Sequence, residues 1–196
     1  RRLGRPCRAP HPDAPADRLG RAWNRVPRER GWRRQSRWER LFARRDRVFI
    51  SYRRDHKEVA QRVYESFRER FGRSRLYFDV HSIPPGVNFR HEIGVALSRC
   101  AAVIALVGPD WATRITNHND PVRLELETAR ELPWCRIYPV LFHEAEMPKE
   151  SELPPSLAWF SDLNGSLLDL HWAYDKQVTK LIKNVRSYAR TIQTQE

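Results

Sequence analysis

The carboxylate of Glu125 is the side chain whose position in this sequence most directly suggests chemistry. In the helix predicted around it, a period of ~100° per residue places Val122, Leu126 and Ala129 on one apolar face. Glu125 falls on the flank of that face, where a carboxylate is partly desolvated or points into a cavity. It is then either a boundary glutamate satisfied by Arg123 or a backbone donor, which the pattern alone favours, or a catalytic carboxylate.

Other reaction chemistries lack their motifs. The sequence contains no G-x-G-x-x-G or Walker loop for a nucleotide, no H-E-x-x-H or Cys/His pairs at zinc spacing, and no G-x-S-x-G nucleophile elbow. We therefore expect no metal ion and no resident cofactor.

Alternating strands and helices must position this carboxylate. A buried strand is predicted at 47–52, and Asp55 with Glu58 resembles a capping box for the helix 56–71 that follows. Further strands are predicted at 75–79, 101–108, 137–142 and 167–170, with helices from 89, at 121–132 and from 174 to 189. This order predicts an α/β fold with a parallel sheet.

The loops carry three further expectations. Pro139 would interrupt its strand and move it towards an edge or a bulge. A polar loop is expected from Gly108 to Asn119, and Asp120-Pro121 marks a helix start. Because ligands bind beyond the carboxyl ends of parallel strands, the segments of interest are 51–55, 79–89 and 111–125.

Positive charge is concentrated in the first 45 residues. They hold fifteen Arg against four acidic residues, a net charge of +11, whereas residues 46–196 hold 21 basic and 20 acidic residues. With scattered prolines, this composition predicts a disordered arm or linker at 1–45. Contact of this arm with nucleic acid or an anionic surface is the alternative interpretation. No basic groove for nucleic acid is expected within the nearly neutral remainder.

The cysteines and the apolar runs bear on location. Cys100 and Cys135 lie beside apolar runs, which predicts buried reduced thiols and a cytoplasmic protein. The longest apolar run, 101–107, is far shorter than the ~20 residues that span a bilayer. The expected organisation is an arm at 1–45, a domain at 46–190 and a tail at 191–196.

Several ordered motifs resemble the Toll/interleukin-1 receptor (TIR) domain family, particularly its bacterial type. The match spans roughly residues 46–186. It comprises Val48-Phe49-Ile50-Ser51-Tyr52-Arg53-Arg54, Phe78-Asp79-Val80 with Ile83-Pro84-Pro85-Gly86, Asp120 to Ala129, Pro139-Val140-Leu141 and Leu153-Pro154. The resemblance implies a flavodoxin-like, doubly wound five-stranded parallel sheet. It also implies, as in many members, cleavage of NAD⁺ as a substrate.

The resemblance assigns roles to particular residues. Glu125 matches the catalytic glutamate of TIR enzymes. The nicotinamide-ribose pocket would be bordered by Arg54, Asp79, Ile83, Gly86 and Phe89. Many TIR enzymes have an aromatic residue four positions before the glutamate, where this chain has Pro121. Trp111 is either the replacement for that ring or a core residue.

The expected function is that of an NAD⁺ glycohydrolase in bacterial defence or virulence signalling, active when self-assembled. Self-association, or pairing with other TIR domains, would use the BB loop, Val80 to Asn88. Two alternatives stay open: a non-catalytic TIR interaction module, and a TIR enzyme acting on nucleic acid held by the arm.

Overall fold

The computed structural model describes residues 44–78, 86 and 88–194. The predicted arm lies almost wholly outside these residues, as do Asp79, Ile83 and most of the BB loop. The expectations for those positions stay predictions.

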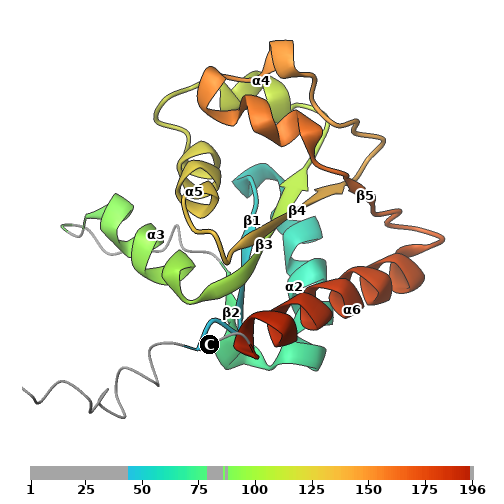
Figure 1. The fold of residues 1–196 in the computed structure, drawn as a ribbon. Coiled ribbons are helices and arrows are strands. Elements are labelled where there is room, and N and C mark those ends of the chain that lie inside the picture. The colour runs from blue at the N-terminus through green and yellow to red at the C-terminus, as the bar shows by residue number, and fades with distance from the viewer. Residues whose placement is uncertain (1–43, 79–85, 87, 195–196) are drawn as a thin grey trace, which may run out of the picture. The chain divides into compact units, whose positions relative to one another are not determined.

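Five parallel strands form one sheet in the order β2-β1-β3-β4-β5. They are β1 (Arg47–Ser51), β2 (Leu76–Tyr77), β3 (Cys100–Val107), β4 (Arg136–Leu141) and β5 (Ser166–Leu167). All eight residues of β3 are buried, because its continuous apolar run lies at the sheet centre with helices on both faces. The predicted doubly wound, flavodoxin-like fold is confirmed (Figure 1).

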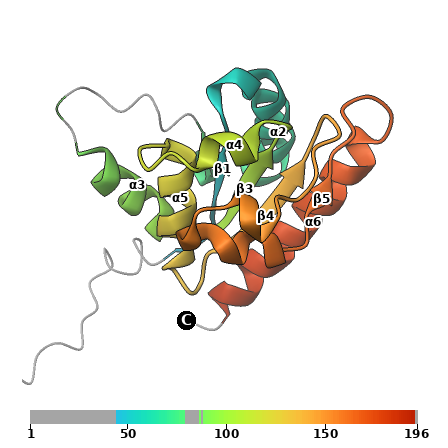
Figure 2. The ribbon, with the colours of Figure 1, turned by 90° about the horizontal axis from the view of Figure 1, so that it is seen from above.

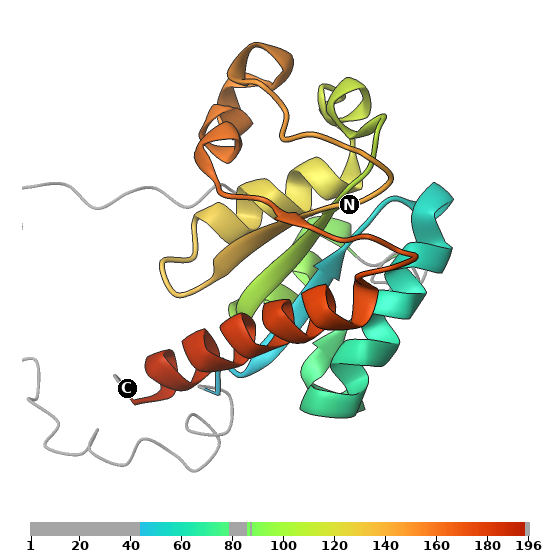
Figure 3. The same cartoon turned by 90° about the vertical axis from the view of Figure 1, so that its right-hand side faces the viewer.

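Helices cover both faces of the sheet. On one face, α2 (Lys57–Phe71) and α6 (Tyr174–Gln193) bury their apolar stripes in a shared core (Figure 3). On the other lie α3 (Phe89–Ser98), α4 (Trp111–Ile115), α5 (Pro121–Arg130) and the 3₁₀ helix η5 (Pro155–Asp162) (Figure 2). The stripe at Val59, Val63, Phe67 and Phe71 is buried as its spacing predicted.

Four local predictions are wrong. Asp55 does not cap α2: it lies in the 3₁₀ helix η1 (Arg54–His56), and the N-cap residue of α2 is His56, whose side chain makes no capping bond. The segment expected as a polar loop contains α4. Pro139 neither ends nor bulges its strand, because it pairs in continuous register with Ala105 of β3 while β5 pairs only from Val140 onward. The second strand is two residues long instead of five.

The closing helix is longer than its apolar spacing predicted. It runs to Gln193, and Ile192 is buried against Ala101 and Ala189, past the expected boundary at 190. Within the described part of the chain, no helix has the length and apolar character needed to cross a membrane.

Candidate active site

The helix that carries Glu125 starts as its sequence predicts. Asp120 is the N-cap residue, and its side chain accepts a hydrogen bond from the backbone N–H of Arg123 at 3.0 Å. Pro121 occupies the first helical turn, where its missing N–H costs nothing. The cap and the proline together fix the start of α5 and hence which side chains face the sheet.

Glu125 is buried, with 1% of its surface exposed. The hydroxyl of Ser51, the last residue of β1, donates a hydrogen bond to Glu125 Oε2 at 2.6 Å. Arg123, one of the two donors that the boundary interpretation offered, instead donates from its side chain to Glu127 Oε1 at 2.7 Å. The fold therefore joins α5 to the carboxyl end of β1 through a carboxyl group.

Burial raises the pKa of Glu125 to about 8. The hydrogen bond from Ser51 lowers this pKa, the nearby Asp120 carboxylate raises it, and the Arg53 guanidinium lowers it, but desolvation is the largest effect. At neutral pH the carboxyl group is consequently protonated in most molecules of the folded chain.

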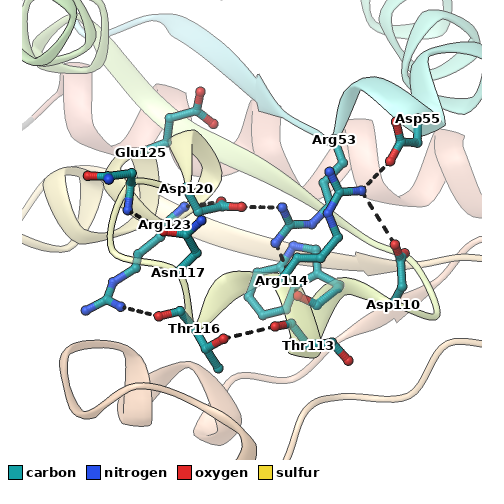
Figure 4. A network of polar contacts seen from close by, with 12 residues as sticks. Arg53, Asp55, Asp110, Thr113, Arg114, Thr116, Asn117, Asp120, Arg123 and Glu125 are labelled. Atoms are coloured by element: carbon teal, nitrogen blue, oxygen red, sulfur yellow. Dashed lines mark hydrogen bonds and ion pairs between the residues drawn. The ribbon is translucent and has the colours of Figure 1, made fainter.

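A buried ion pair lies beside this carboxyl group. Arg53, 4% exposed, directs Nη1 to Asp120 Oδ2 at 2.5 Å and Nη2 to the backbone carbonyl of Trp111 at 3.2 Å. Asp120 thus serves both as the cap of α5 and as the anion that pairs with Arg53. Figure 4 shows Arg53 reaching Asp120, with the Glu125 side chain on the neighbouring turn.

A pocket of about 400 Å³ opens at the carboxyl end of β1. Its lining joins the residues after β1 to the first turn of α5 and to α4: Tyr52, Arg53, Arg54, Asp55, Arg114, Asp120, Pro121 and Val122. On its rim Arg114 forms ion pairs with Asp55 and, at 3.6 Å, with Asp110 (Figure 4).

The other predicted site residues that the structure describes lie in different environments, from exposed to fully buried. Arg54 is exposed and lines this pocket. Gly86 has φ +87°, the left-handed conformation for which glycine was expected there. Phe89 starts α3 and is half-buried. Trp111 is a core residue: it is 1% exposed and stacks on Phe160 with ring centroids 4.9 Å apart.

The sequence did not single out Ser51 and Arg53. Both fall in the polar segment after the first strand, which was the only signal that could have found them. Their partners lie 74 and 67 residues away along the chain, at Glu125 and Asp120.

Comparison with known proteins assigns the family. A family model described as "TIR domain" matches residues 48–182, more than half of the chain. The chain belongs to the TIR-domain family. No curated protein matches it.

Two solved structures of TIR proteins are similar to this TIR domain. One is a metazoan TIR-STING receptor from C. gigas in complex with 2',3'-cGAMP, at 17% identity and a TM-score of 0.44. That match covers 72% of this chain and 38% of the receptor. The other is the TIR domain of the Toll-related receptor TRR-2 from Hydra magnipapillata, also at 17% identity and a TM-score of 0.44, over 70% of this chain and 98% of that one.

Other groups in this TIR domain offer less chemistry near Glu125. Cys100 and Cys135 are free and buried, as expected, and burial raises the pKa of both thiols. Among residues 44–78, 86 and 88–194, no group of three or more His, Cys, Asp or Glu side chains is arranged to hold a metal ion. A larger cavity of about 710 Å³ lies beyond β4 and β5, lined by other residues. The chemistry available beside the smaller pocket is that of one buried carboxyl group and one buried ion pair.

Proposed function

We propose that this TIR domain is an NAD⁺ glycohydrolase that releases nicotinamide and leaves ADP-ribose, linear or cyclic. The observation that carries the proposal is the buried carboxyl group of Glu125 at the carboxyl edge of the sheet, held by Ser51 one helical turn from a pocket. A buried carboxyl group with a strongly raised pKa beside a pocket is typical of a functional site.

A single carboxylate suffices for this reaction. The bond between C1′ of the ribose and the pyridinium nitrogen breaks, and its electron pair neutralises the pyridinium, so no acid is needed to protonate the leaving group. The ionised Glu125 stabilises the positive charge that develops at C1′. Water then adds to C1′ and loses its proton, which gives ADP-ribose; attack by a ring nitrogen of the adenine instead gives the cyclic product.

The raised pKa fits a cationic substrate. Without ligand, burial favours the neutral acid. The positive charge of the nicotinamide ring favours the ionised form when it approaches, because an opposite charge within ~4–6 Å lowers a carboxyl pKa. Substrate binding thus prepares the anion that the transition state requires.

Activity in this proposal depends on self-assembly. Glu125 is closed to solvent in the single chain, so NAD⁺ reaches it only after a conformational change. We infer that contact with other TIR domains through the BB loop supplies that change. The setting in this proposal is bacterial defence or virulence signalling in the cytoplasm. Many TIR enzymes have an aromatic ring at the position where this chain has Pro121. Contact with a neighbouring TIR domain is therefore more important here, because the chain lacks that ring.

The test is nicotinamide release by the full chain, concentrated until light scattering shows assembly. Glu125→Gln keeps the size of the side chain and its bond with Ser51 but cannot ionise, so release should fall to background. Glu127→Gln, two residues along the same helix and half-exposed, is the matched control and should retain activity. Release that persists in Glu125→Gln would refute the role of this carboxyl group.

A non-catalytic interaction module is the second candidate. It is favoured by the fact that Glu125 and Arg53 already have buried partners, as structural polar groups do. On this hypothesis the assembled chain releases no nicotinamide, and Glu125→Gln assembles as the native chain does. An assembled sample without activity decides for this candidate.

A further inference from the structure

A groove of about 670 Å³ runs between the carboxyl end of α2 and the stretch of α6 from Thr179 to its carboxyl end. Its lining holds four cations and four hydroxyl side chains, and no carboxylate: Arg70, Lys183, Arg186 and Arg190, with Thr179, Ser187, Thr191 and Thr194, and Ile182 at its base. This contradicts the expectation that the nearly neutral domain has no basic cluster. Lys183, Arg186 and Arg190 share one face of α6 through their own spacing, and the fold adds Arg70 because it lays α6 against α2 (Figure 3).

These cations differ from most others on the described surface because they lack partners. Arg68, Arg75, Arg114 and Arg123 each pair with a carboxylate within the domain. Within the described part of the chain, the side chains of the four groove cations make no ion pair and no hydrogen bond. Their charge is therefore available to a partner outside the chain.

We propose that this groove binds the phosphate backbone of double-stranded nucleic acid. Lys, Arg, Ser and Thr side chains are the groups that contact phosphates without reading sequence. Lys183 and Arg190 are seven residues apart on α6, which is ~10.5 Å along the helix axis. That length corresponds to about three steps of ~3.4 Å along one strand, so the three groove cations of α6 can contact successive phosphates.

The composition of the groove separates a duplex from other polyanions. Single strands are held by stacking their bases on aromatic rings, and none lines this groove. A helix that inserts into a membrane surface exposes an apolar face, but α6 buries its apolar face in the core. The large apolar side chains that are exposed among the described residues, Val95, Leu167 and Trp172, do not line it either.

The groove also lies at the edge of the sheet where the chain enters the domain. Ala189 and Ile192 of α6 pack on Ala101 of β3, and its neighbour Cys100 pairs with Arg47 at the start of β1. The groove therefore lies near the amino ends of the strands, remote from the pocket at their carboxyl ends.

The experiment measures binding of the full chain to 20-base-pair duplexes of DNA and of RNA by fluorescence anisotropy between 50 and 300 mM salt. The variant Lys183→Gln, Arg186→Gln, Arg190→Gln removes three groove cations. The control Lys57→Gln, Arg90→Gln, Lys149→Gln removes three exposed cations elsewhere. Because the N-terminal segment is present in both, their difference reports the groove alone.

Each phosphate contact contributes about 0.9 to the slope of log K against log salt for duplex DNA. Relative to affinity at 1 M salt, one contact therefore strengthens binding about fivefold at 0.15 M salt. The groove variant should therefore bind on the order of 100-fold more weakly than the control, with a slope smaller by about 2.7. The relative loss on the DNA and RNA duplexes identifies which of the two the groove prefers.

Ser187→Glu guards against a folding defect, because it adds one carboxylate to the groove and leaves every cation in place. It should weaken duplex binding several-fold while the thermal unfolding midpoint stays unchanged. Equal affinity of the groove and control variants for both duplexes would overturn the proposal. So would groove-dependent sedimentation with phosphatidylserine vesicles in the absence of duplex binding, which would assign the groove to a membrane.

Discussion

The protonation of Glu125 yields a prediction that does not depend on any substrate. Burial raises the pKa of this carboxyl group from an ordinary 4.5 to about 8. Between these two pH values the folded chain holds a proton that the unfolded chain releases. The stabilisation from the neutral carboxyl group is complete below pH 4.5 and is lost as the pH rises through 8. Stability should therefore fall with pH, the reverse of the behaviour of a surface ion pair.

The perturbation is Glu125→Gln, which keeps the shape of the side chain and cannot titrate. One proton bound in the folded state alone changes the free energy of unfolding by ~1.4 kcal/mol per pH unit. With a pKa of about 8, the native chain should lose about 3 kcal/mol relative to the variant between pH 5 and pH 8. This loss of stability is due to Glu125 alone, because every other ionisable group is present in both proteins.

The assay is urea unfolding of both proteins at pH 5, 6.5 and 8, followed by circular dichroism. Glu127→Gln is the control on the same helix. Partial burial opposes ionisation of Glu127, but hydrogen bonds from Ser156 and Arg123 outweigh it and lower its pKa. The control should therefore show a constant offset across this range. A constant offset for Glu125→Gln as well would show that its carboxyl group is ionised in the fold, and would refute the reasoning from burial.

Three further substitutions test the geometry around the site. Ser51→Ala removes the hydrogen bond that lowers the pKa of the candidate catalytic carboxyl group, so the pH midpoint of nicotinamide release should move above about 8, as a pH–rate profile would show. Arg53→Ala leaves the buried carboxylate of Asp120 without its partner and should cost about 3–5 kcal/mol in chemical denaturation; a cost below 1 kcal/mol would contradict the buried pair. Gly108→Ala would place a methyl group 2.8 Å from Nε2 of His56 and should lower the unfolding free energy by about 1–3 kcal/mol.

The candidate active site and the groove differ in how strongly salt affects their charged groups. At the carboxyl edge of β1, Arg53 and Asp120 are buried and paired, so salt affects this pair little. On α6 the cations are exposed and unpaired within the described chain, so their binding should weaken steeply with salt. Salt dependence alone can thus separate the two proposed activities in one preparation.

Elements whose signals are local could be predicted from the sequence. The apolar run of β3 predicted a central buried strand, and Asp120 with Pro121 predicted the first turn of α5, because capping chemistry and hydrophobic periodicity act over a few residues. The parallel order of the sheet followed from strands alternating with amphipathic helices. Motif resemblance then predicted the family, which the comparison confirmed.

Local signals failed where the deciding contact is made elsewhere. The five-residue helix α4 is stabilised by Trp111 packing on Phe160, a contact absent from its own sequence pattern. Asp55 is a residue type that commonly caps helices, yet its carboxylate accepts a hydrogen bond from Arg114, 59 residues away. A local preference worth about 1 kcal/mol yields readily to such tertiary contacts.

Which polar groups come into contact depends on the tertiary fold. Ser51 and Glu125 are 74 residues apart, and the periodicity that placed Glu125 on a flank carried no information about its partner. Arg70 and Arg190 belong to separate helices but line one groove. The net charge of residues 46–196 is close to zero, so counting charges along the chain did not reveal this groove. Hydrophobic burial folds α5 and α6 onto the sheet for reasons of packing, and the polar side chains that come together are fixed by that packing, not by their own order in the sequence.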